Sequence, residues 1–277
     1  MFILPSFTCL GFVFMMYFSI HIMAADAQHI ENFDAEKARI YQSIVGFTSN
    51  CPGGVFLDFG SNTGVQLCRF CEPSFFPGSP LKRRFDEVFG ANRTGACIMS
   101  FEPNPVHIES IHNMSEVCRK RHNIPVLQLS KVALWEMDGN MTFYLSLGQA
   151  VQEGASLFRR AKHVNSQVNN VQVHTLSVPR IFRILRHHLP KPIPIFVKMD
   201  IEGAEFEVIR ALIHTGTLCY PSHYEVEYHQ KRVRSADMPD YIGTFMKFLG
   251  ASCNVSINPL DDETGLTMKL SEYMLKT

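Results

Sequence analysis

The sequence predicts one α/β domain in which the strands of a mostly parallel sheet alternate with helices. Two short apolar runs, Val55–Leu57 and Phe196–Met199, are typical of strands buried on both faces. Each run ends at an acidic residue followed by a glycine, before a helix-like pattern begins. Because ligands of α/β sheets bind at the carboxyl ends of the strands, we expect these two strand ends to form one site.

The first strand end carries Asp58, Gly60 and Gly64. Gly60 permits the turn that leaves the strand, and Gly64 lets the next helix approach closely, so backbone N–H groups can face a ligand. The side chain of Asp58 is expected at the end of the strand, where its carboxylate could pair with an ammonium group. This end of the sheet therefore predicts a small-molecule site.

A second acid, Glu102, follows the next predicted strand in the segment Ile98–Asn104. It is placed to accept hydrogen bonds from two ribose hydroxyls. One acid for an amine and one for a ribose fit S-adenosylmethionine better than a dinucleotide. The glycines favour the same cofactor, since their spacing is G-x-x-x-G and not the G-x-G-x-x-G that binds a pyrophosphate.

Together with two further segments, these motifs resemble the FkbM family of S-adenosylmethionine-dependent O-methyltransferases. The resemblance extends from about Val55 to about His229 and rests on Asp58–Gly64, Phe101–Pro105, Val132–Leu134 and Lys198–Glu205. It implies a Rossmann-like class I methyltransferase fold, with a mostly parallel seven-stranded sheet, one antiparallel edge strand and helices on both faces. It also implies that S-adenosyl-L-methionine contacts Asp58, Gly60, Asn62, Gly64, Glu102, Asp200, Glu202 and, through its adenine ring, the backbone around Ala133.

One departure from the family pattern precedes the last motif. The family usually has Thr-Leu-Asp where this chain has Thr175-Leu176-Ser177. Serine caps helices nearly as well as aspartate, and Pro179 suits the first helical turn. We therefore expect the helix to begin here despite the change.

Asp200 and Glu202 lie two residues apart at the second strand end. If the backbone stays extended, both side chains point to the same side. Such a pair can raise each other's pKa, hold a divalent cation or hold an acceptor hydroxyl. We predict that Asp200 faces the methyl-transfer centre and that Glu202 orients cofactor or acceptor. The sequence assigns no metal ligand and leaves open whether a metal is needed.

The segment His223–His229 alternates strictly, which predicts a strand with Glu225, Glu227 and His229 on one face. A hydroxyl acceptor needs a general base, and a histidine can serve near neutral pH. His229 is the first candidate for the base and Asp200 the second. The alternative is that His229 simply ends the strand with a hydrogen bond.

The N-terminus has the composition of a signal sequence. The first 25 residues contain no Lys, Arg, Asp or Glu, and Ala25-Asp26-Ala27 fits a signal-peptide cleavage site. Cleavage there would separate residues 1–27 from a domain of residues 28–277. The missing basic n-region and the length of the apolar run favour a retained signal anchor instead. In either case we expect the folded part in the ER or Golgi lumen, membrane-anchored, or secreted.

Glycosylation sequons and cysteines agree with that compartment. Four N-x-S/T sequons occur, at Asn92, Asn113, Asn140 and Asn254. Of the eight cysteines, Cys9 lies in the leader. The other seven can form at most three bridges and leave one thiol. The lone C-x-x-C of Cys68 and Cys71 favours a bridge or packing over a metal site.

The predicted reaction is methylation of a hydroxyl acceptor. The compartment alone suggests a sugar hydroxyl on a glycan or glycolipid. The 26 basic and 26 acidic residues balance, so charge gives no indication of nucleic-acid binding, and membrane contact is expected only through an uncleaved N-terminal segment. Two other classes stay open: a non-catalytic secreted or tethered binding protein on this fold, and an NAD(P)-dependent oxidoreductase, against which the missing third glycine counts.

Overall fold

The computed structural model describes residues 35–145, 155–158, 169–190, 192–229 and 241–260. The chain divides into two compact units, Met1–Ser43 and Ile44–Thr277. The described part of the first unit is helical, in a helix that covers residues 35–47. No helix within the described ranges is long and apolar enough to cross a membrane. The predicted leader, residues 1–27, lies outside these ranges.

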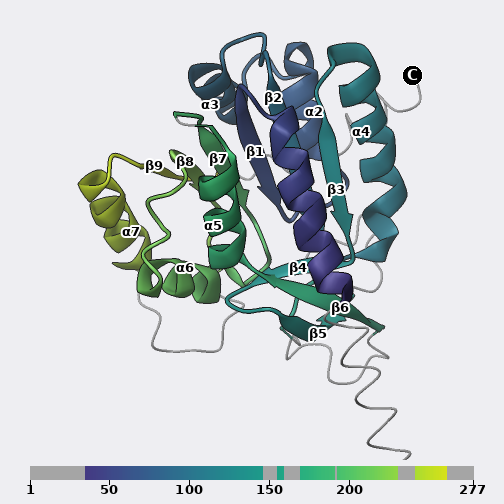
Figure 1. The fold of residues 1–277 in the computed structure, drawn as a ribbon, viewed down its shortest axis with the longest axis vertical. Helices are drawn as coiled ribbons and strands as arrows, with labels where there is room; N and C mark the ends of the chain where they lie inside the picture. The colour runs from purple at the N-terminus through teal and green to yellow at the C-terminus, as the bar shows by residue number, and fades with distance from the viewer. Residues whose placement is uncertain (1–34, 146–154, 159–168, 191, 230–240, 261–277) are drawn as a thin grey trace, which may run out of the picture. The chain divides into compact units, whose positions relative to one another are not determined.

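A parallel six-stranded sheet forms the centre of the second unit (Figure 1). Its order is β3-β2-β1-β7-β8-β9, so the chain builds outward from β1 in one direction and then from β7 in the other. The strands are β1 Gly54–Phe59, β2 Ala96–Glu102, β3 Val126–Ser130, β7 Ile195–Met199, β8 His223–Val226 and β9 Ser256–Pro259. Every residue of β1, β2 and β7 is buried, as predicted for strands covered on both faces.

The strand count of the main sheet differs from the prediction. The described residues supply six strands, all paired in parallel, where seven with an antiparallel edge were expected. Antiparallel pairing within the described part of the chain occurs in another sheet. The Rossmann-like α/β class is confirmed.

A second sheet of three strands has the order β4-β6-β5. Its strands are β4 Val132–Trp135, β5 Gly139–Tyr144 and β6 Asn170–Ser177. β6 pairs in parallel with β4 and antiparallel with β5. This sheet is separate from the main sheet. Apolar side chains of this sheet pack with Ala204, which follows β7 in the chain.

Helices cover both faces of the main sheet. They are α2 Val65–Cys71, α3 Pro80–Phe89, α4 Ile108–His122, α5 Val178–His188, α6 Glu205–His214 and α7 Tyr241–Ser252, with 3-10 turns at Thr48–Asn50, Pro73–Phe75 and Pro105–His107. Phe70 of α2 and Phe85 of α3 pack on Phe56 of β1. On the other face of β1, Phe182 of α5 stacks with Phe59. The two aromatic layers fix the sheet between its helices.

The helix α5 connects β6 to β7 and packs on the main sheet through Phe182. Ile181, Phe182 and Leu185 are buried, and the arginines between them, including Arg183, face solvent. It begins directly after Ser177, with Pro179 in its first turn. The expected serine cap is absent at this helix: the Ser177 hydroxyl instead donates to the carbonyl of Glu136, 3.1 Å away.

Three disulfides cross-link the described residues: Cys51–Cys97, Cys71–Cys118 and Cys219–Cys253. Cys68 remains a buried thiol, and burial raises its pKa to about 12. Three bridges and one thiol match the prediction for the seven cysteines after the leader. The two cysteines of the C-x-x-C motif are separated, because Cys71 pairs with Cys118 on α4.

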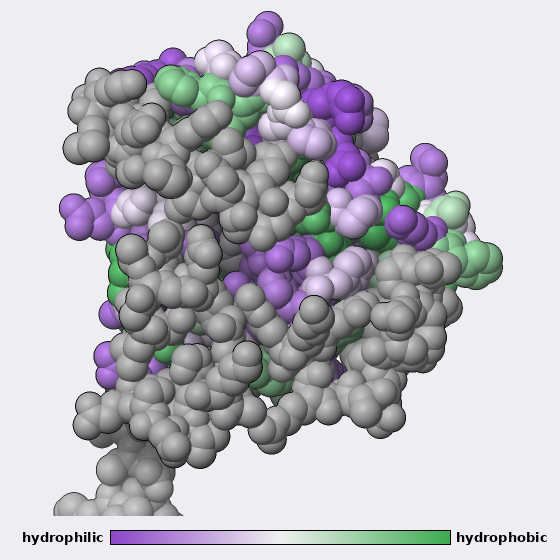
Figure 2. Space-filling view, turned by 180° about the vertical axis from the view of Figure 1, so that it is seen from behind, coloured by the Kyte–Doolittle hydropathy of each residue, from purple (hydrophilic) through white to green (hydrophobic). Residues whose placement is uncertain are grey.

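The surface of the described part is mixed in character. Figure 2 shows hydrophilic and hydrophobic residues interspersed on the face opposite that of Figure 1, which is usual for protein surface in contact with water. The asparagines of the four sequons are all exposed: Asn92, Asn113, Asn140 and Asn254.

Candidate active site

The two predicted strand ends lie side by side in the sheet. β1 pairs with β7 so that Asp58 is opposite Lys198 and Phe59 opposite Met199. Directly after the strands, the amide of Asp200 donates to the carbonyl of Phe59 at 3.1 Å. Gly60 has φ +80°, and a Cβ atom there would lie 1.9 Å from the carbonyl oxygen of Asp200. The turn after β1 can therefore reach the loop after β7 only because residue 60 is glycine.

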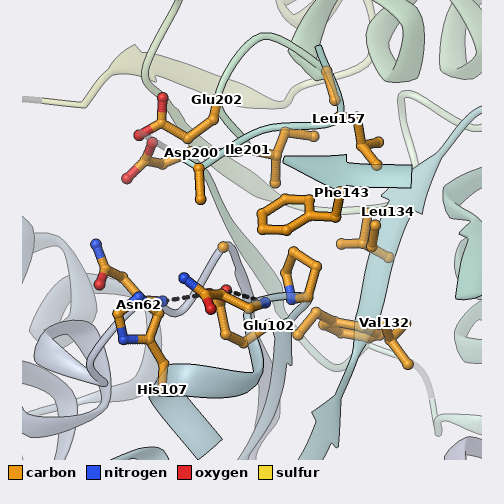
Figure 3. A pocket seen from close by; sticks show the side chains of 17 residues that line it. Asn62, Glu102, His107, Val132, Leu134, Phe143, Leu157, Asp200, Ile201 and Glu202 are labelled. Carbon is orange, nitrogen blue, oxygen red and sulfur yellow. Dashed lines mark hydrogen bonds between the residues drawn. The ribbon is translucent and has the colours of Figure 1, made fainter. Parts of the chain in front are cut away.

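A pocket of about 580 Å³, counting space open to solvent, lies at this edge of the sheet (Figure 3). Three chain segments after strands β1, β2 and β7 contribute to it, together with the second sheet. The lining residues are Gly60, Asn62, Phe101, Glu102, Pro103, Asn104, His107, Val132, Ala133, Leu134, Phe143, Ala155, Leu157, Asp200, Ile201, Glu202 and Ala204. Of the residues predicted to contact cofactor, Asp58 and Gly64 are not among them.

Glu102 is the central polar group of the pocket. Its Oε2 accepts a hydrogen bond from the amide of Asn62 at 2.6 Å, and its Oε1 accepts one from the amide of Asn104 at 2.8 Å. Burial raises the pKa of Glu102 to about 8, although the two backbone amides and Lys198 oppose the shift. A buried carboxylate fixed in this way still has lone pairs to accept hydrogen bonds from a ligand.

One wall of the pocket is apolar. Val132, Ala133 and Leu134 come from β4, and Phe143 from β5, with Leu157 beside them (Figure 3). This wall suits a flat, weakly polar ring. On the opposite side Figure 3 places His107 beside Asn62. Burial lowers the pKa of His107 to about 4, so its imidazole is uncharged at neutral pH.

The loop after β1 holds Asn62 and Gly64 in different roles. Asn62 lines the pocket and adopts a left-handed backbone, with φ 50°. Gly64 lies behind it, with φ 89°, as the residue that precedes the first turn of α2. A Cβ atom on Gly64 would contact Met114 and Ile111 of α4 at 3.5–3.6 Å. Gly64 thus serves the packing of α2 on α4.

Asp58 is buried beneath the pocket and faces Lys198. The Nζ atom of Lys198 lies 3.5 Å from Asp58 Oδ1 and 3.3 Å from Asp200 Oδ2. Burial raises the pKa of Asp58, and Lys198 partly opposes this. Burial alone would lower the pKa of Lys198, but Asp200 and Asp58 outweigh it and raise the pKa. The ammonium group expected near Asp58 is thus supplied within the chain by a lysine that stays charged.

Asp200 and Glu202 lie together at the other side of the pocket, with their carboxylates pointing the same way (Figure 3). The prediction assumed an extended backbone over Asp200–Glu202, and this is wrong. The backbone turns at Glu202 and Gly203, whose φ angles are 59° and 110°. A glutamate in the left-handed region is uncommon and is held there by its surroundings. The amides of Ile201 and Gly203 both donate to the buried carboxylate of Glu205, at 2.9 Å each.

His229 lies among carboxylates from both sides of this loop. Its Nδ1 is 2.9 Å from Glu205 Oε1, and its Nε2 is 3.1 Å from Glu227 Oε1 and 3.8 Å from Asp200 Oδ1. Burial lowers the pKa of His229, but hydrogen bonds to Glu205 and Glu227 outweigh it and raise the pKa to about 10. In this state the imidazole already carries its proton at neutral pH.

The strand that leads to His229 is shorter than predicted. β8 ends at Val226, and the alternation expected to continue to His229 stops there. Glu227 contacts His229, whereas Glu225 is fully buried and pairs with Arg84 of α3 and with His223. Glu225 therefore belongs to the core and not to the pocket.

The model of the FkbM methyltransferase domain matches residues 59–253, more than half of the chain. The chain belongs to the FkbM methyltransferase family. A comparison with curated proteins and one with solved structures found no match. The FkbM match extends over every pocket-lining residue and His229, and it begins one residue after Asp58.

Two residues of the site could not be assigned from the sequence: His107, which lines the pocket, and Lys198, which lies beneath it. A lysine inside an otherwise apolar strand, as Lys198 is, indicates that its charge is paired. Nothing in the local pattern of His107 distinguishes it from a helix-start residue. Methyl transfer is the activity that membership in the FkbM family supports.

Proposed function

We propose that this FkbM protein is an S-adenosylmethionine-dependent O-methyltransferase that acts on a hydroxyl acceptor. The observation that carries the proposal is Glu102, a buried carboxylate fixed by the amides of Asn62 and Asn104 next to an apolar wall. A carboxylate with free lone pairs beside a ring-sized apolar surface fits a ribose attached to an adenine.

The residues present fit this cofactor. Glu102 would hold the ribose hydroxyls, and the β4 segment around Ala133 would lie along the adenine ring. The loop of Gly60 and Asn62 would hold the amino-acid part, because a side chain at position 60 would fill the space between the two strand ends. Asp58 would act indirectly, by keeping Lys198 and the glycine turn in place.

When bound, S-adenosylmethionine supplies a methyl group activated by its sulfonium. The chain's contribution is alignment of the acceptor and removal of its proton. Asp200 and Glu202 line the pocket and offer carboxylates to an acceptor hydroxyl. His229 stands next to Asp200 but does not line the pocket, and its imidazole is protonated at neutral pH. We therefore place Asp200 before His229 as the group that receives the proton.

The proposed compartment is the secretory pathway, with a sugar hydroxyl of a glycan or glycolipid as acceptor. Support comes from the three disulfides, which persist in oxidising compartments, and from the exposure of all four sequon asparagines. An N-terminal anchor or a cleaved signal peptide would both deliver the domain there. A balanced charge gives no support to nucleic acid as acceptor.

The decisive experiment is calorimetric titration of the full chain, made in a secretory host, with S-adenosylmethionine, S-adenosylhomocysteine and NAD. We expect micromolar binding of the first two, its loss in Glu102→Ala, and its retention in Glu109→Ala, a matched change at an exposed glutamate of α4. Absence of binding by folded protein would overturn the proposal in favour of a non-catalytic binding protein. Tight NAD binding would favour an oxidoreductase.

A further inference from the structure

The imidazole of His229 is held with one nitrogen facing a group of carboxylates. Nε2 lies 3.1 Å from Glu227 Oε1, 3.5 Å from Glu202 Oε2 and 3.8 Å from Asp200 Oδ1. These residues come from two separate segments, the turn after β7 and the chain after β8. The fold thus brings a carboxylate oxygen from each of three residues within 3.8 Å of one imidazole nitrogen.

Glu205 sets the direction of this imidazole. Its buried carboxylate is anchored by the amides of Ile201 and Gly203, and its Oε1 lies 2.9 Å from His229 Nδ1. The ring therefore presents Nε2, and not Nδ1, to Asp200, Glu202 and Glu227. Carboxylates that hold the far nitrogen of a histidine in this way are the usual supports of metal-binding histidines.

The spacing of these atoms suits a small divalent ion. Two ligands that each lie about 2.1 Å from an ion are about 3.0–3.4 Å apart, in octahedral and tetrahedral geometry respectively. The distance from Nε2 to Glu227, 3.1 Å, lies within this range. The distances to Glu202 and Asp200, 3.5 and 3.8 Å, are a few tenths of an ångström longer. Asp200, Glu205 and His229 also each offer an atom within 4.8 Å of the other two.

We propose that His229, Asp200, Glu202 and Glu227 form a divalent-cation site, with Glu205 as the carboxylate that orients His229. The ion would replace the proton that Nε2 carries in the ion-free chain, and that proton would be released to solvent. One imidazole nitrogen among carboxylate oxygens favours a transition ion such as Mn²⁺ or Zn²⁺ over Mg²⁺. The charge of the cluster also favours a bound cation, because four carboxylates surround one imidazole. Lys198 reaches Asp200 at 3.3 Å, but it is shared with Asp58.

The position of the site gives the cation a role. Asp200 and Glu202 line the pocket, so an ion bound to them would be open to an acceptor there. A divalent ion lowers the pKa of a hydroxyl that it binds, which makes the oxygen a better nucleophile at neutral pH. This role rests on the proposed function, whereas the existence of the cation site does not.

Binding can be measured without any acceptor. The full chain from a secretory host is treated with chelator, and Mn²⁺ is then titrated in and followed by electron paramagnetic resonance, with Zn²⁺ and Mg²⁺ followed by calorimetry. We expect one ion per chain, bound roughly tenfold to a hundredfold more weakly in Glu205→Gln, which loses the group that orients His229, and at least as much more weakly in Glu227→Gln and in His229→Gln, which each lose a ligand. Glu207→Gln is the matched control, since Glu207 pairs with Arg210 on the surface of α6 and should leave binding unchanged.

Circular dichroism and thermal melting verify that each variant is folded, and S-adenosylhomocysteine is titrated in parallel. Absence of ion binding by folded wild-type chain overturns the cation site, and so does unchanged binding in the double variant Glu227→Gln/His229→Gln. Failure of the cation site with intact S-adenosylhomocysteine binding leaves the proposed function standing. Ion binding without cofactor binding supports the site and counts against the methyltransferase proposal.

Discussion

The Nζ atom of Lys198 donates a hydrogen bond of 2.6 Å to the carbonyl oxygen of Gly60. This contact joins the two motifs from which the site was predicted, because Lys198 lies on β7 and Gly60 on the turn after β1. The same ammonium group lies between Asp58 and Asp200. One buried cation therefore lies between two carboxylates and fixes the glycine turn against the β7 loop.

Replacing Lys198 with methionine should destabilise the chain strongly. Removing one partner of a buried ion pair leaves an uncompensated charge, which costs about 3–5 kcal/mol. We expect a lower midpoint in urea unfolding, with partial recovery in Lys198→Met/Asp58→Asn, where the buried carboxylate is removed as well. An unfolding midpoint equal to that of the wild type would show that the ion pair contributes nothing.

Gly60→Ala should disrupt the loop that receives the cofactor. The new Cβ would lie 1.9 Å from the carbonyl oxygen of Asp200, and residue 60 has φ +80°. S-adenosylhomocysteine affinity should fall at least tenfold, or folding should fail. Gly78→Ala serves as control, since no atom lies within 4 Å of a Cβ there and its φ is not positive. Equal affinity in the two variants would contradict the close approach of the two strand ends.

Glu102 should make the stability of the ligand-free chain depend on pH. Its pKa rises from 4.5 to about 8 on folding. Between these two pH values Glu102 is therefore protonated in the folded chain and ionised in the unfolded chain. Stability should therefore fall as pH rises from 4.5 to about 8, and this slope should be reduced in Glu102→Gln. At pH 8 that variant should melt higher than the wild type, by about 2–4 °C for each kcal/mol relieved.

Glu102 should make cofactor affinity rise with pH, whereas it makes the stability of the ligand-free chain fall. The ionised carboxylate is the better acceptor for ribose hydroxyls, so affinity should rise with pH up to about 8 and then level off. Calorimetry across this range measures the effect. A flat profile in the wild type would mean that Glu102 does not change its charge on binding.

Expression in a secretory host should yield glycosylated protein. The asparagines of all four sequons are exposed, so each is accessible to a glycan in the folded chain. Removal of N-glycans with a glycosidase should reduce the apparent mass, and each Asn→Gln change at an occupied site should remove one step. An unchanged mass after glycosidase treatment would count against the proposed compartment.

The features that could be predicted from the sequence are local. An apolar run that ends at an acid and a glycine identified the ends of β1 and β7, and an apolar run that ends at an acid and a proline identified Glu102 on β2. These strand-end patterns can be recognised from consecutive residues, without knowing which other segments lie next to them in the fold. For this reason the fold class and most of the pocket-lining polar residues could be found.

The features that could not be predicted depend on neighbours. Strict alternation predicted a strand as far as His229, but β8 ends at Val226, which pairs with Met199, the last residue of β7, and with Pro259 of β9. Likewise, the partners of Lys198 and the pairing of the cysteines follow from the arrangement of separate elements.

Two of the disulfides unite the elements that carry the ribose side of the pocket. Cys51–Cys97 joins the entry of β1 to β2, and Cys71–Cys118 joins α2 to α4, across separations of 46 and 47 residues. In the chain-entropy model each such cross-link stabilises by about 4 kcal/mol, because it restricts the unfolded chain. Both lie within the first half of the domain, so that half can be locked by oxidation before the segment with Lys198 and Asp200 has been synthesised. Both bridges are buried, whereas Cys219 of the third bridge is exposed. A reducing agent would therefore act first on Cys219–Cys253 and only later on the side of the pocket that holds Gly60, Asn62 and Glu102.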